Sequence, residues 1–110
     1  MEKFDETLGA LNSVQTGHGS LGESILQMNA ENLEASGLDD VNYTLVRLAA
    51  LVAVDAPVGS YELALELGKE VGLTAEQVAG VLVAIAPVVG GPKVLTAAER
   101  LNDAGNDLLG

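Results

Sequence analysis

The segment at residues 41–54 constrains the fold more than any other part of the chain. It reads VNYTLVRLAALVAV, and its apolar side chains fall on nearly every side when it is drawn as a helix. A helix of that kind is expected at the centre of a domain, covered on several sides. Asp55-Ala56-Pro57 follows. Because the residue before a proline avoids the α region and proline donates no N–H, this helix is predicted to stop there.

The rest of the chain also has helical signals, so an all-α fold of about six helices is predicted. Phe4, Leu8 and Leu11, at i, i+4 and i+7, predict a short first amphipathic helix, and a polar loop with glycines is predicted to follow it at residues 12–20. The fourth helix is predicted to restart at Ser60 after the Asp-Ala-Pro turn. The other predicted boundaries are a capping box at Ser20–Glu23, an end at Gly37, a cap at Asp39 or Asp40, an end at Gly72, a capping box at Thr74–Gln77, a kink or end at Pro87, and a restart at Pro92.

Composition bears on how such helices bury their surface. Of the 110 residues, 48% are hydrophobic but only 3% are aromatic, so Ala, Val and Leu supply the apolar surface. A chain this short and this apolar is expected to hide part of that surface in a homo-oligomer, although a compact monomer with a tight Ala/Leu core is the alternative. We expect one structural domain, with residues 1–37 as an acidic helical segment that packs on a helical domain at residues 38–110.

Charge and cysteine content exclude several functions. The formal charge is −11, and the five basic residues are scattered, so binding to nucleic acid or to an anionic membrane surface is not expected. Without cysteine the chain cannot form disulfides, iron–sulfur clusters or thiolate zinc sites, and we predict no metal and no cofactor. With no signal peptide evident, and no apolar run of the roughly 20 residues that a spanning helix needs, a cytoplasmic protein is predicted.

The stretch from Leu38 to Asp55, LDDVNYTLVRLAALVAVD, resembles the carboxymuconolactone decarboxylase family, which includes the alkyl hydroperoxidase D-like peroxidases. The resemblance extends to about residue 101. It includes GLTAEQV at residues 72–78, which matches the family pattern G-[LVI]-[ST]-x-E-[EQ]-[IV]. The resemblance implies an all-α, alkyl hydroperoxidase D-like fold that assembles as trimers or hexamers through helix packing.

The same resemblance locates a reactive site that this chain lacks. In peroxidase members, the joint before the fourth helix reads C-x-x-C-x-x-x-H, with a glycine eight residues after the histidine. Aligned on Gly72, the three reactive positions are Pro57, Ser60 and Ala64. The chemistry needs a thiolate, a resolving thiol and a base, and these three side chains supply none of them. Thiol peroxidase activity is therefore excluded.

Four residues remain as candidates for a site. Arg47 is a lone charge in the apolar helix, so it is expected either to pair with a carboxylate, such as Asp55 or Glu62, or to hold an anionic ligand. Tyr61 and Ser60 could add hydroxyl groups, although core packing and capping of the fourth helix are the alternative roles. His18, the only histidine, lies in the polar loop outside the matched region.

Three functions follow from these residues. The leading hypothesis is a cysteine-less, peroxidase-inactive family member that forms a homo-oligomer and binds at most a small anionic ligand. A second is a cofactor-free, decarboxylase-like enzyme that acts on a small organic acid or lactone. The third is a non-catalytic assembly or interaction module.

Overall fold

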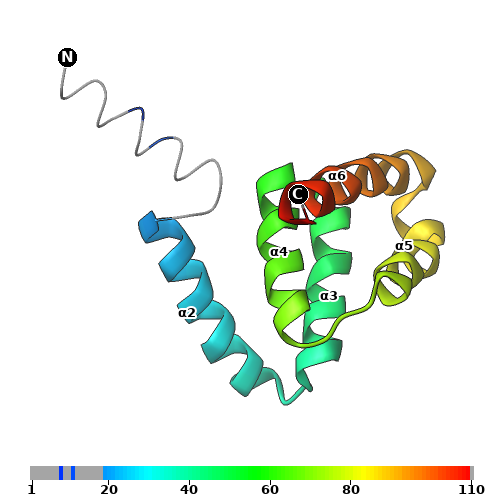
Figure 1. The fold of residues 1–110 in the computed structure, drawn as a ribbon. Helices are drawn as coiled ribbons and strands as arrows, with labels where there is room; N and C mark the ends of the chain where they lie inside the picture. Colours follow the sequence, from blue (N-terminus) through cyan, green and yellow to red (C-terminus); the bar gives the residue numbers. More distant parts are fainter. Residues whose placement is uncertain (1–7, 9–10, 12–18, 110) are drawn as a thin grey trace. The chain divides into compact units, whose positions relative to one another are not determined.

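The structure is a computed structural model that describes residues 8, 11 and 19–109, with side chains as far as residue 106. This part of the chain is helical and contains no strand, which confirms the predicted all-α class. Backbone contacts divide the chain into two units, Met1–Gly37 and Leu38–Gly110. The helices are α2 (Gly19–Ser36), α3 (Asp40–Ala53), α4 (Val58–Glu70), α5 (Ala75–Val89) and α6 (Gly91–Leu109), as Figure 1 shows.

The first unit contains α2. Leu8 and Leu11 are also helical, but the rest of the predicted first helix lies outside the described residues. Helix α2 begins at Gly19, so Ser20 lies inside the helix and is not the capping residue that the sequence predicted. The helix ends where Gly37 takes a φ of +70°, the left-handed conformation predicted for its cap.

Helix α3 begins where the sequence predicts. Asp39 is its N-cap: a side-chain oxygen of Asp39 accepts a hydrogen bond of 2.8 Å from the backbone N–H of Asn42. The choice between two adjacent aspartates is thereby settled in favour of the first. Helix α3 contacts α4, α5 and α6, in agreement with the central place that its apolar character predicts.

Helix α4 begins earlier than predicted. Pro57 is its N-cap residue, and the backbone N–H of Ser60 donates to the carbonyl of Pro57 at 3.1 Å. Ser60 therefore lies within the first turn, and the interpretation of Ser60 as the capping residue is wrong. Proline ends one helix and also suits the start of the next, because its missing N–H would have no partner in a first turn in any case.

Helix α5 begins with the predicted capping box. The backbone N–H of Gln77 donates to the Thr74 hydroxyl at 3.1 Å, and the Gln77 side chain accepts from the Thr74 N–H at 2.9 Å. Pro87 does not end the helix, which continues for two more residues to Gly90 at φ +93°. Pro92 then lies in the first turn of α6, as predicted.

The core of the second unit forms where α3, α4 and α6 meet. In this unit α3 and α4 lie side by side, and α6 crosses them near the α3–α4 joint (Figure 1). Alanines on α6 let its backbone approach the other helices closely. The buried residues are Leu48, Val52, Ala56, Tyr61, Ala97, Leu101 and Ala104. No helix in the described part is both long and apolar enough to cross a membrane.

Candidate functional site

The joint between α3 and α4 has an unusual backbone. Asp55 adopts a φ of +58°, the left-handed region that only a few per cent of non-glycine residues occupy, although aspartate tolerates it better than most. The turn it makes ends α3 and exposes carbonyl groups that have no partner further along the helix. These carbonyls must find donors elsewhere.

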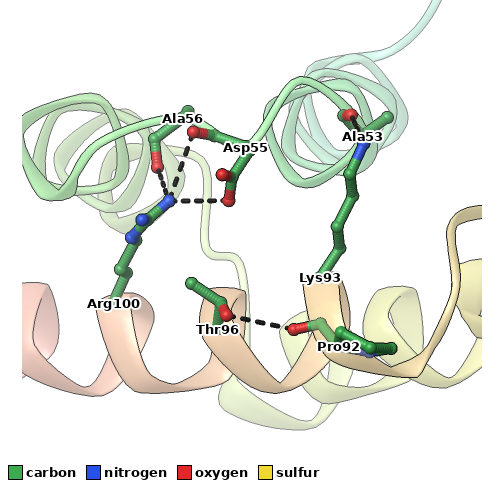
Figure 2. Close-up of polar contacts among 7 residues, drawn as sticks. All are labelled: Ala53, Asp55, Ala56, Pro92, Lys93, Thr96 and Arg100. Atoms are coloured by element: carbon green, nitrogen blue, oxygen red, sulfur yellow. Dashed lines mark hydrogen bonds and ion pairs between the residues drawn. The ribbon is translucent and has the colours of Figure 1, made fainter.

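Two basic side chains of α6 supply those donors (Figure 2). Lys93 Nζ donates to the carbonyl of Ala53 at 3.0 Å. Arg100 Nη1 donates to the carbonyls of Asp55 at 3.2 Å and Ala56 at 2.8 Å. The last turn of α3 contains no basic residue of its own, so the cations that complement the negative end of its dipole come from another helix.

Arg100 also forms an ion pair with Asp55. Its Nη1 atom lies 2.8 Å from Asp55 Oδ1, with the arginine side chain 30% exposed and the aspartate side chain 53% exposed. An exposed pair of this kind contributes about 0–1 kcal/mol, so the contact with the part-buried Ala56 carbonyl is the stronger one. Asp55 is therefore held by Arg100, and the pairing of Arg47 with Asp55 that the sequence offered is not formed.

Tyr61 lies beside this joint in the interior. Its side chain is fully buried, in the same core cluster as Leu48 and Val52. Burial raises the pKa of Tyr61 above 10.0. The charge of Arg100 opposes that shift, and the charge of Asp55 adds to it. The phenol is accordingly neutral at physiological pH, and its position favours the core-packing role for Tyr61.

Arg47 has a different environment. It is half-buried on α3; its Nη1 donates to the Tyr43 hydroxyl at 3.2 Å, and its guanidinium carbon lies 5.4 Å from the centre of the Tyr43 ring. In the described part of the chain, this guanidinium thus pairs with a phenol rather than with a carboxylate. Val46 on the same helix and Val54 at its C-cap are 58% and 72% exposed.

The structure separates the sequence candidates. Ser60 and Tyr61 are adjacent in α4 next to the joint, but Arg47 lies eight residues before Asp55, about 12 Å further back along the helix axis. His18 lies outside the described residues. The basic side chain at the joint is instead that of Arg100 on α6. Sequence reasoning missed it because its partners lie 44 and 45 residues away along the chain.

The positions of the missing reactive site share one face of α4. Pro57, Ser60 and Ala64 are spaced three and four residues apart, so they follow one side of the helix from its N-cap. Proline and alanine are chemically inert there, and a serine hydroxyl without a base is a poor nucleophile. Among the described residues, no group of three His, Asp or Glu side chains could hold a metal ion.

These features define a class of protein: an all-α domain in which the joint before the fourth helix carries no thiol and is held by basic side chains. The chain belongs to the carboxymuconolactone decarboxylase family, whose family model matches residues 20–103. That match begins within α2, earlier than the stretch from residue 38 on which the resemblance rests. Searches among curated proteins and among solved structures gave no match to the chain.

Proposed function

We propose that this protein is a peroxidase-inactive family member that binds a small carboxylate at Arg47 and works as a homo-oligomer. The observation that carries the ligand proposal is the state of Arg47. Its guanidinium is half-buried and contacts a phenol where an ion pair would be expected.

The energetics favour an anionic ligand at this position. A half-buried guanidinium loses part of its hydration, and a cation–π contact at a partly exposed position returns only about 0.5–1 kcal/mol. A carboxylate can accept two parallel N–H bonds from the planar guanidinium, which satisfies both its charge and its geometry. Stacking on Tyr43 holds the guanidinium in one orientation, so less side-chain entropy is lost when the ligand binds.

The two arginines of the second unit therefore have different roles. Arg100 directs Nη1 at three oxygen atoms of the joint and holds the scaffold. Arg47 contacts a neutral hydroxyl and an aromatic ring, neither of which neutralises its charge. Of the two, Arg47 is the better candidate for recognising a ligand.

Binding is favoured over turnover. Decarboxylation without a cofactor needs a proton donor that reaches the developing carbanion or enol. Tyr61, the phenol beside the joint, has no exposed surface. Proton delivery by Tyr61 would thus require the core to open, whereas binding at Arg47 requires no such change.

Calorimetric titration with a panel of small mono- and dicarboxylates, including lactone acids, tests the proposal. We expect binding by the wild type, a loss of at least about tenfold in affinity for Arg47→Gln, and a smaller loss for Arg47→Lys, which keeps the charge but not the fork. Lys69→Gln is the matched control, because it removes one exposed positive charge from the last turn of α4. Equal binding by Arg47→Gln, or no binding by the wild type, would contradict the ligand proposal.

The homo-oligomer proposal is supported by apolar surface that the described part of the chain leaves uncovered. Val83, Val88 and Leu95 are 76%, 86% and 73% exposed. Large apolar side chains at that exposure on so acidic a chain suit a contact with another copy. A mass of 11.2 kDa in solution, which is that of one chain, would contradict this proposal.

A further inference from the structure

Helix α5 differs from its neighbours in how little of it is covered. It is the most apolar helix of the described part, yet none of its residues is buried, whereas α3, α4 and α6 each contribute to the core. Glu76 is the only charged residue among its 15. A helix of this composition is typical of one that is packed on more than one side.

Beyond the first turn of α5, where Ala75, Glu76 and Gln77 are exposed as well, its exposed residues follow one side of the helix. They recur at spacings of three and four, the period of a single helical face. We call this set the α5 face; it consists of Ala79, Gly80, Val83, Ala84, Pro87 and Val88. It is charge-free, with small residues mainly toward its N-terminal end and larger ones mainly toward its C-terminal end. A Cβ added at Gly80 would meet nothing within 4 Å, so this position is a notch open to an incoming group.

We propose that the α5 face packs against the α5 face of a second copy of this chain, antiparallel about a two-fold axis between Val83 and Ala84. This inference rests on the proposed homo-oligomer and specifies its interface. In that register Val83 lies opposite Ala84 of the other copy. Val88 lies opposite Ala79, and Pro87 lies opposite Gly80. Each larger side chain thus meets a small one, so the face is complementary to itself.

Charge also favours a second copy in this orientation. Two chains of formal charge −11 repel one another, and a stable contact requires a surface where carboxylates do not face each other. The α5 face meets that requirement. In the antiparallel register the two Glu76 residues lie at opposite ends of the contact, about 22 Å apart along the axis. A parallel pair would place them side by side.

A two-fold contact restricts the number of subunits. Each α5 face is used once and joins two copies, so an assembly that uses every face contains an even number of chains. Of the two states that the family resemblance implies, this inference is compatible with a hexamer and not with a trimer.

Molar mass in solution provides the first test. Light scattering after size exclusion should give the wild type an even multiple of 11.2 kDa. Val83→Glu places two like charges against each other across the two-fold axis and should lower that multiple. Val46→Glu is the control, because Val46 is also exposed but lies on α3. Circular dichroism of each variant shows whether it stays helical.

The outcomes separate the two proposals. A wild-type monomer would overturn both. If the wild type is an oligomer and a helical Val83→Glu variant has the same mass, the α5 contact is refuted but the homo-oligomer proposal is not. The same conclusion follows if the wild-type mass is an odd multiple, above one, of the chain mass. If the α5 face instead binds a different protein, the purified wild type should likewise be a monomer.

Cross-linking tests the relative orientation of the two α5 helices, which the molar mass does not report. The native chain has no cysteine, so a single introduced thiol reports one contact. Val83→Cys lies beside the two-fold axis and should give a disulfide-linked dimer on oxidation with diamide. Ala79→Cys should not, because its copies lie about 13 Å apart along the axis in the antiparallel register. Val54→Cys, exposed at the end of α3, is the control. Equal cross-linking of Ala79→Cys, or none with Val83→Cys, would refute the register.

Discussion

Replacing Arg100 with methionine removes the charged tie between α6 and the α3–α4 joint while keeping most of the apolar stem. The variant loses the 2.8 Å hydrogen bond to the part-buried Ala56 carbonyl and the 2.8 Å contact with Asp55. It also loses the longer bond, at 3.2 Å, to the Asp55 carbonyl. The joint is then left with a left-handed Asp55 and an Ala56 carbonyl without its charged donor.

The expected loss is about 2–3 kcal/mol in the free energy of unfolding. Hydrogen bonds that involve a charged group contribute about 1.5–3 kcal/mol, and among the bonds of Arg100 the Ala56 contact is the one that is part-buried. The ion pair adds about 0–1 kcal/mol, since Asp55 is 53% exposed and solvent screens it. The Asp55 carbonyl is at the surface and can bond to water instead.

Chemical denaturation at a fixed protein concentration measures this loss, because association would otherwise shift the transition. Lys93→Met is the matched control. It removes one exposed hydrogen bond to the Ala53 carbonyl and should cost at most about 1 kcal/mol. Asp55→Asn removes only the charge of the pair and should also stay within about 1 kcal/mol. An Arg100→Met loss no larger than that of Lys93→Met would refute the reasoning, since the Ala56 bond would then contribute nothing.

Further predictions concern four single positions. Because burial raises the pKa of Tyr61 above 10.0, the folded protein keeps the phenol proton at pH values where the unfolded chain loses it. This contribution to stability is complete below pH 10.0 and is lost as the pH rises above it; Tyr61→Phe should reduce that alkaline slope in denaturation curves. Gly68→Ala should cost about 1–3 kcal/mol, because the new Cβ would lie 2.8 Å from Leu73 Cδ2 and 3.2 Å from its Cβ. Gly105→Ala, a helical position with open space, should instead gain about 0.5–1 kcal/mol in the same assay. Thr74→Ala removes half of a capping box and should lower the thermal midpoint by the equivalent of about 1 kcal/mol.

Local signals predicted most of the helix boundaries. Asp39 and the Thr74 capping box act within three residues of their own positions, so the sequence contains everything needed to recognise them. Gly37 likewise ends α2 through its own backbone conformation. The error at Ser60 arose because Pro57 was taken as the end of one helix only, although the same missing N–H suits the first residues of the next.

Contacts between distant segments could not be predicted in the same way. Arg100 meets Asp55 across 45 residues, and nothing near either residue identifies its partner. One regularity could have suggested a role: Lys93 and Arg100 are seven residues apart, so they share a face of α6, and α3 lacks a basic residue in its last turn. The expectation for Arg47 did not allow for the stacking on Tyr43, one turn earlier on the same helix.

The ligand proposal and the interface proposal involve different helices, and this allows them to be tested against each other. Tyr43, which orients Arg47, comes from the same helix of the same chain. If the carboxylate site is complete within one chain, dissociating the oligomer should leave it intact. We therefore expect Val83→Glu, at a concentration where light scattering shows the lower mass, to bind the carboxylates with the affinity of the wild type. A parallel loss of mass and of affinity, with helicity retained, would mean that a second copy completes the site, and Arg47 would then have to lie at a subunit interface.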